Sequence, residues 1–259
     1  MSTILFPSPV FGPVISRRLG VSLGINLLPA TGKVCTFDCI YCECGLNAQR
    51  KTEEKLPSVE LVVSELEATL EKMKAQGQLP DVITFAGNGE PTAHPRFAEI
   101  IEEVLKLRDR FVPNAQLSVL SNGTQVHKPM VFNALKKVEN NILKLDTVSE
   151  DYIERVNCPS SYYRVKEQIE SFKRFDGHVM IQTMFLKGED SRGRSVNNTT
   201  EDYVKPWIAA IKEIRPQKVM IYTIDRETPH KALLKATPAE LDAIAEQVRQ
   251  EGFEVSVSY

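Results

Sequence analysis

The sequence predicts an α/β protein whose strands form a parallel sheet. Short apolar and β-branched runs alternate along the chain with stretches in which apolar residues recur every three or four positions. The composition, 42% hydrophobic and 25% charged, is that of an ordinary globular protein. A chain of 259 residues buries roughly three quarters of its unfolded surface, so its core needs no disulfide support. Strands that alternate with helices favour βαβ units with right-handed crossovers.

Seven runs carry the strand pattern, and they define six successive βα units. Six units are fewer than the eight of a closed barrel, so either an incomplete barrel or an open doubly wound sheet fits this alternation. The predicted strands span Val21–Leu28, Val82–Ala86, Leu117–Leu120, Ile142–Leu145, Val179–Leu186, Lys218–Ile224 and Phe253–Val257.

Four helices are predicted from apolar residues that share one helical face. The last helix is also marked at both ends. Thr237 is an N-cap, Pro238 suits the first turn, Glu240 completes a capping box, and Gly252 fits a C-terminal stop. The residues that define the four helices are Leu61, Val62, Leu66, Leu70 and Met73; Phe97, Ile100, Ile101, Val104 and Leu105; Tyr203, Trp207, Ile208 and Ile211; and Leu241, Ile244, Ala245 and Val248.

We expect residues 1–259 to form a single domain, because no composition shift, internal repeat or low-complexity segment marks a boundary. The polar stretch Lys187–Thr200 is predicted to be one long loop. Loops longer than about 12 residues are uncommon and often act as lids or binding loops.

Charge and hydropathy argue against two classes of protein. The 32 Lys and Arg residues nearly balance the 34 Asp and Glu residues, which is too even for a dedicated nucleic-acid module. No apolar run approaches the roughly 20 residues of a membrane span. Arg17 and Arg18 before Val21–Leu28 superficially match a twin-arginine export signal. Ser22 and Asn26 interrupt that apolar run and cysteines follow at once, so we expect a cytoplasmic protein with a strand here.

The five cysteines predict an inorganic centre. Four of them fall within ten residues in the segment Thr31–Gly45, and Cys35, Cys39 and Cys42 have the spacing C-x3-C-x2-C. An odd number of clustered cysteines fits a metal or redox site in a reducing compartment better than a disulfide framework. Three thiolates in one loop suit zinc or an iron–sulfur cluster. Structural zinc requires four protein ligands, and Cys44 is available as a fourth.

The cysteine spacing, with aromatic Tyr41 just before the third cysteine, resembles the signature of the radical S-adenosylmethionine (SAM) superfamily. Further segments at the ends of predicted strands support this resemblance. Segments near Phe11–Gly20 and Thr223–Arg226 resemble, more narrowly, the wyosine-synthetase-like radical SAM proteins. The strand-end segments are Gly87-Asn88-Gly89-Glu90-Pro91-Thr92, Ser121-Asn122-Gly123 and Leu145-Asp146.

This resemblance implies a partial (β/α)6 TIM-like barrel and an enzyme that uses one [4Fe–4S] cluster to cleave SAM reductively. The resulting 5′-deoxyadenosyl radical would abstract hydrogen from a substrate. The resemblance implies that Cys35, Cys39 and Cys42 hold the cluster, and it points to no catalytic side chain. Contacts to SAM are implied for Tyr41, Gly87, Asn88, Gly89, Glu90, Ser121, Asn122, Asp146, Gln182 and Met184.

The implied partners are SAM, an electron donor such as flavodoxin or ferredoxin, and a substrate that the sequence leaves open. A small molecule, a nucleotide, RNA and a protein side chain all fit. Wyosine-type tRNA modification is one alternative, with Arg17 and Arg18 placed to contact phosphate. Against it, the chain carries no second cysteine group, and only Lys144, by its place near a strand end, suggests a pyruvate-binding lysine.

A zinc-stabilised binding protein is the other alternative, with Cys35, Cys39, Cys42 and Cys44 as ligands. It closes all four ligands within ten residues and leaves the glycine-rich segment after the second strand unexplained. We therefore expect Cys44 to be a neighbour of the cluster rather than a ligand, and Cys158 to be a free thiol.

Overall fold

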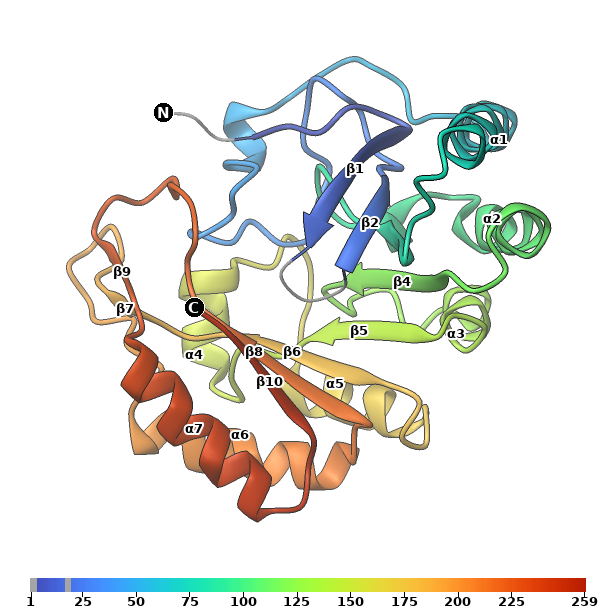
Figure 1. The fold of residues 1–259 in the computed structure, drawn as a ribbon. Coiled ribbons are helices and arrows are strands. Elements are labelled where there is room, and N and C mark those ends of the chain that lie inside the picture. Colours follow the sequence, from blue (N-terminus) through green and yellow to red (C-terminus); the bar gives the residue numbers. More distant parts are fainter. Residues whose placement is uncertain (1–3, 17–19) are drawn as a thin grey trace.

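The chain folds around one curved, mostly parallel sheet of eight strands in the order β1-β2-β3-β4-β5-β6-β8-β10. The computed structural model describes residues 4–16 and 20–259. Figure 1 shows the strands as an arc, with α1, α2 and α3 around one side and α6 and α7 around another. The strands are β1 (Val10–Ser16), β2 (Gly20–Ile25), β3 (Val82–Phe85), β4 (Gln116–Ser121), β5 (Asn140–Lys144), β6 (Met180–Met184), β8 (Lys218–Tyr222) and β10 (Val255–Ser258).

The seven strands predicted from sequence are the seven parallel strands of this sheet, and the helices between them complete six βα units. The sequence left two arrangements open, and the curled sheet is the partial barrel. The principal helices are α1 (Val59–Ala75), α2 (Phe97–Phe111), α3 (Pro129–Leu135), α5 (Val165–Lys173), α6 (Glu201–Ile214) and α7 (Pro238–Gln250). The predicted cap of α7 is confirmed, because Thr237 and Glu240 form a capping box.

Strand alternation divides the sheet residues between two environments. Ile83 and Phe85 of β3 lie in the main hydrophobic core with residues of the helices, whereas Thr84 between them faces the hollow side of the sheet. There its hydroxyl lies 2.8 Å from that of Ser22 on β2. Because successive side chains of a strand point to opposite faces, the hollow side receives every second residue of each strand.

Three features were absent from the sequence prediction. Strand β1 pairs antiparallel with β2 at the edge of the sheet and contains Gly12 and Pro13. Helices α3 and α5, of seven and nine residues, are too short to show clear periodicity. A short helix α4 (Glu150–Tyr152) continues into one turn of π-helix (Ile153–Asn157).

The predicted loop Lys187–Thr200 is more ordered than expected. It begins inside β7 (Leu186–Gly188), which pairs with β9 (Leu233–Lys235) in a separate two-stranded sheet. Val196 and Asn198 within it are fully buried. The loop therefore packs against the body of the protein around Val196 and Asn198, whereas residues 191–195 are exposed.

Arg17 and Arg18, which were predicted from sequence as phosphate contacts, lie outside the described residues. Across residues 4–16 and 20–259, no helix has both the length and the apolar character to cross a membrane.

Candidate functional site

A cavity of about 360 Å³ lies at the carboxyl ends of the parallel strands. In parallel α/β sheets this edge is where ligands bind, because the loops that follow the strands converge there. All of the site residues predicted from sequence line this cavity except Asn88 and Asp146. The lining comprises Phe6, Cys35, Phe37, Cys39, Tyr41, Cys42, Glu43, Cys44, Ala86, Gly87, Gly89, Glu90, Leu120, Ser121, Asn122, Lys144, Gln182, Met184 and Tyr222.

The cysteine loop, Thr31–Gly45, winds tightly around one end of the cavity. Backbone hydrogen bonds from Cys42 to the carbonyl of Cys39 (3.0 Å) and from Gly45 to the carbonyl of Cys42 (2.9 Å) turn the chain back on itself. All five cysteines of the protein are free thiols. The predicted ligands Cys35, Cys39 and Cys42 are thus brought together at one cavity without a disulfide among them.

Two asparagine side chains reach the predicted ligands from distant parts of the chain. The amide of Asn122, after β4, lies 3.8 Å from the sulfur of Cys35, and that of Asn157 lies 3.6 Å from the sulfur of Cys39. Asn157 ends the π-helical turn, and such turns often occur at functional sites. The N–H groups point at sulfur, the arrangement that supports thiolate ligands.

The four thiols of the loop differ in their proton affinity. Burial raises the pKa of Cys35, and it raises the pKa of Cys39 to about 12. The pKa of Cys42 is instead lowered to about 6, first by a hydrogen bond with Cys44 and then, against the effect of burial, by the ammonium of Lys33. The same hydrogen bond raises the pKa of Cys44. Its thiol also donates to the carbonyl of Gly87 at 3.4 Å, so Cys44 keeps its proton while Cys42 is the thiolate.

The glycine-rich segment after β3 is pressed against the cysteine loop. The nitrogen of Val34 donates to the carbonyl of Asn88 (3.0 Å), and the nitrogen of Glu90 donates to the carbonyl of Val34 (3.0 Å). Gly89 has a φ of +139°, and a Cβ on it would lie 1.9 Å from the carbonyl oxygen of Val34. Only glycine permits this close approach.

Asn88 and Glu90 were predicted to contact SAM, and in the structure their side chains form hydrogen bonds within the protein. The Asn88 amide donates to the carbonyls of Phe6 (2.9 Å) and Pro29 (2.8 Å), which places the N-terminal segment over the cavity. The carboxylate of Glu90 is buried and accepts hydrogen bonds from the hydroxyl of Ser121 and the nitrogen of Asn122, both at 2.7 Å. Burial raises the pKa of Glu90. Glu90 therefore joins the end of β3 to the end of β4.

A polar cluster forms the opposite wall of the cavity. Asp146 lies behind the lining and accepts hydrogen bonds from the hydroxyl of Tyr41, the amide of Asn157 (2.7 Å) and the nitrogen of Met184 (2.9 Å). The ammonium of Lys144 lies 3.5 Å from the Asp146 carboxylate. Asp146 thus fixes Tyr41, Asn157 and Met184 from behind the cavity lining.

Lys144 is the one cation in the described lining of the cavity. Its ammonium donates to the Tyr222 hydroxyl at 2.6 Å and lies 5.2 Å from the centre of the Tyr41 ring. Burial lowers the pKa of Lys144, but the charge of Asp146 and the contact with Tyr222 outweigh this and raise it. Lys144 therefore stays protonated beside the cavity.

A second cavity, of about 250 Å³, continues into the hollow of the sheet and shares Phe6, Glu43, Ala86, Leu120 and Gln182 with the first. The amide nitrogen of Gln182 is buried and has no hydrogen-bond partner among the residues that the structure describes. At the outer end of this cavity the guanidinium of Arg226, after β8, pairs with the carboxylate of Glu43 at 3.0 Å.

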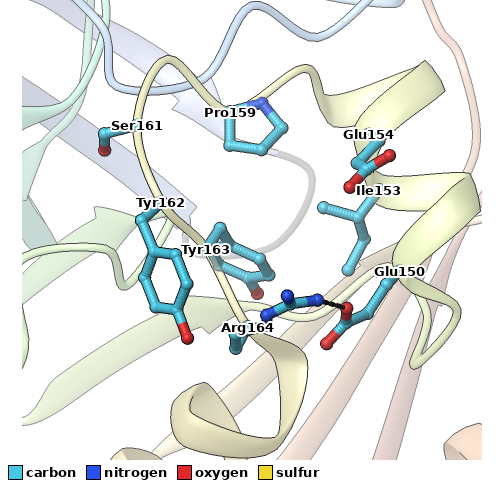
Figure 2. A pocket seen from close by; sticks show the side chains of 8 residues that line it. All are labelled: Glu150, Ile153, Glu154, Pro159, Ser161, Tyr162, Tyr163 and Arg164. Atoms are coloured by element: carbon cyan, nitrogen blue, oxygen red, sulfur yellow. Dashed lines mark hydrogen bonds and ion pairs between the residues drawn. The ribbon is translucent and has the colours of Figure 1, made fainter.

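A third pocket lies outside the site. Figure 2 shows its lining from α4 and the loop that follows Cys158, including Glu150 and Arg164, which form an ion pair. Tyr163 of this loop packs edge-on against Phe37 of the cysteine loop, with ring centres 5.3 Å apart. The loop therefore supports the cysteine loop from behind. Cys158 is half-buried, and its thiol donates to the carbonyl of Arg155 at 3.3 Å.

Sequence reasoning missed several residues of the site. Phe6 and Asn157 lie outside the motifs, so no local pattern signals them. Tyr222 directly precedes the segment Thr223–Arg226, but nothing in the sequence shows that its side chain faces the cavity. Lys33 likewise stands near a motif, two residues before Cys35, and its inward orientation is what the sequence does not show.

The residues present fit an iron–sulfur cluster. In the described part of the chain, no group of three or more His, Cys, Asp or Glu residues is arranged to hold a single metal ion. A four-iron cluster places each thiolate on a different iron, so its ligands are spread wider than those of one zinc ion. The sulfurs of Cys35 and Cys39 with their amide donors, and the glycine turn beside them, suit such a group.

Comparisons with known proteins agree with this fit. The family model of the radical SAM superfamily matches residues 30–196. A UPF0026 protein of Helicobacter pylori (strain 26695) is 33% identical over 229 residues, which cover 87% of this chain and 69% of that protein.

Two solved structures share the fold at low sequence identity. A radical SAM methyltransferase from Sphaerobacter thermophilus has a TM-score of 0.67 at 14% identity and covers 92% of this chain; this chain covers 66% of it. The structure of anSMEcpe with bound AdoMet has a TM-score of 0.58 at 17% identity, covering 91% of this chain and 63% of that one.

Proposed function

This chain belongs to the radical SAM superfamily and to the UPF0026 proteins, and from this premise we propose that Cys35, Cys39 and Cys42 hold its catalytic cluster. The protein is a radical SAM enzyme whose cofactors are a [4Fe–4S] cluster and SAM. The observation that carries the assignment of ligands is the cavity, which brings these three free thiols and the glycine turn together.

When bound, the cluster supplies the electron that cleaves SAM to methionine and a 5′-deoxyadenosyl radical, which abstracts hydrogen from the substrate. The protein contributes position and the exclusion of water. Asn122 and Asn157 hold the thiols of Cys35 and Cys39 in place. Gly87 and Gly89 let the backbone of the turn pack directly against Asn26 and Val34, which fixes the turn at the edge of the cavity.

We place SAM against the wall formed by Tyr41, Ser121, Asn122 and Met184, which face the same cavity as the thiols. Lys144 offers a permanent positive charge there, suited to a carboxylate. Asn88 and Asp146 act one step further back, since neither lines the cavity and each is held by internal hydrogen bonds. Glu90 lines the cavity and also positions Ser121 and Asn122 beside it.

We place the substrate in the second cavity, below the thiols. It opens directly into the first, so a bound molecule lies next to the site of radical formation. Gln182 lines both cavities, and its buried amide nitrogen has no hydrogen-bond partner among the described residues. An acceptor oxygen on the bound molecule would remove the cost of leaving this donor unpaired, about 1–3 kcal/mol. Gln182 is thereby assigned to the substrate as well as to SAM.

The proposal extends to residues 1–259 as one catalytic domain, supported by the single continuous sheet. We further propose a cytoplasmic enzyme that receives its electron from flavodoxin or ferredoxin, because thiol ligands persist where cysteines stay reduced.

The test is anaerobic reconstitution with iron and sulfide. The protein should bind about four irons, turn brown, and form 5′-deoxyadenosine from SAM when a reductant is added. Colourless protein that holds only zinc would overturn the proposal.

A further inference from the structure

A buried ammonium lies at the centre of the cysteine loop. The side chain of Lys33 is 1% exposed. Its ammonium donates to the carbonyl of Gly45 at 2.7 Å and to the carboxylate of Asp38 at 3.1 Å. These two bonds connect the start, middle and end of the loop. A lysine is almost never fully buried unless it is paired, and these two bonds supply the partners that keep Lys33 inside the loop.

The charge of Lys33 acts on the sulfurs of the loop. Lys33 stands two residues before Cys35, and Gly45, whose carbonyl accepts from the Lys33 ammonium, donates its own nitrogen to the carbonyl of Cys42 at 2.9 Å. The buried ammonium is therefore enclosed by the turn that carries Cys35 and Cys42. In a site closed to water, a charge acts on its neighbours several times more strongly than it does at the surface.

The negative partner of Lys33 is on the solvent side. The side chain of Asp38 is 29% exposed, and the same carboxylate oxygen accepts a hydrogen bond from the nitrogen of Asn47 at 2.7 Å. Water and this second donor weaken the hold of Asp38 on the ammonium. Much of the positive charge of Lys33 is therefore left to act on the sulfurs.

We propose that Lys33 is a positioning residue that raises the reduction potential of the cluster, its ammonium stabilising the additional negative charge of the reduced state. This inference rests on the proposed function. The step is the transfer of one electron from an external one-electron donor to the cluster, with no proton taken up. The charge of the cluster with its three thiolates becomes more negative by one unit, and the nearby cation favours that change.

The experiment compares anaerobically reconstituted wild type with Lys33→Met and Asp38→Asn, using dithionite titration followed by electron paramagnetic resonance. Lys33→Met removes the positive charge and should lower the potential. Asp38→Asn removes the opposing negative charge, keeps an oxygen that can accept from Lys33 and Asn47, and should raise it. Each change should shift the reduction equilibrium at least tenfold, which is 59 mV for one electron. Lys235→Met, on exposed β9, is the control and should leave the potential unchanged.

Opposite shifts in the two variants separate an electrostatic role from a structural one. A merely structural Lys33 predicts iron loss, or shifts of the same sign, when either partner is changed, and that result overturns the inference. If Lys33→Met binds no iron, Asp38→Asn decides alone, and an unchanged or lower potential in it rejects the inference. Wild-type protein that forms no four-iron cluster rejects the proposed function itself, and this inference falls with it. A cluster that forms but keeps one potential in all variants rejects only the inference.

Discussion

Two irregular segments, the cysteine loop and the loop Lys187–Thr200, use their polar groups in opposite ways. The cysteine loop turns the thiols of Cys35, Cys39 and Cys42 toward the cavity. The only long contacts there from side-chain amides in the described residues reach Cys35 (3.8 Å) and Cys39 (3.6 Å). In the loop Lys187–Thr200, buried polar side chains form hydrogen bonds with other groups of the protein. Asp190 accepts from the nitrogens of Arg192 and Arg194, at 2.9 and 3.0 Å. Thiols that face a cavity are typical of a functional segment. A carboxylate that is paired within the protein, such as that of Asp190, is typical of a supporting segment.

Asn198 shows how the supporting loop works. Its amide donates to the carbonyls of Met184 (2.8 Å) and Asp146 (3.3 Å), and its oxygen accepts from the nitrogen of Leu186 (2.9 Å). Two of these partners are residues whose side chains were predicted to bind SAM. The loop thus fixes the backbone behind the cavity and presents no lid over it.

The largest expected effect is on the cysteine loop. Cys39→Ala should abolish both the cluster and SAM cleavage, because it removes one of three ligands. Cys44→Ala should leave both largely intact, because Cys44 holds its proton and contacts Gly87. Iron content and 5′-deoxyadenosine formation measure both outcomes. Loss of iron from Cys44→Ala would show that the ligands are assigned wrongly.

A change in the supporting loop should affect stability instead. Asn198→Ala leaves three buried backbone groups without partners, and each costs about 1 kcal/mol or more. We expect the free energy of unfolding in urea to fall by about 3 kcal/mol while the folded fraction still takes up four irons. Asn197→Ala is the matched control with a smaller loss, because Asn197 is half-buried and its side chain bonds, among the described residues, only to Thr199 of the same loop. Wild-type stability in Asn198→Ala would contradict the contrast between the two segments.

The smallest effect concerns pH. Burial alone would raise the pKa of Asp190, but the backbone nitrogens of Arg194 and Arg192 and the side chain of Arg155 lower it overall. A carboxylate with a lowered folded-state pKa contributes stability above its ordinary pKa of about 4, and this is lost as the pH falls below that value. Thermal unfolding of the apoprotein should therefore depend less on acid in Asp190→Asn than in wild type. Parallel curves for the two proteins would contradict the prediction.

The parts predicted well from sequence are those encoded locally. The seven parallel strands follow from their apolar runs, and the three cysteines within eight residues of each other line one cavity as their spacing suggested. Their assignment as cluster ligands stays a prediction. Strand β1 was missed because Gly12 and Pro13 break the strand pattern, and an edge strand tolerates them. Asn157 was missed because it meets Cys39 across 118 positions. Lys33 was missed because only the folded loop shows a charged side chain turned inward.

The Arg226–Glu43 pair has a consequence for how molecules reach the cavity. Both side chains are partly exposed, 49% and 39%, so their attraction contributes no more than about 1 kcal/mol. Separating them requires no strand to unpair, whereas the thiol end of the cavity is fixed by buried bonds. Opening the second cavity by separating this ion pair therefore costs little free energy, and the cost falls as ionic strength rises. A molecule could enter there without disturbing the buried bonds around the thiols.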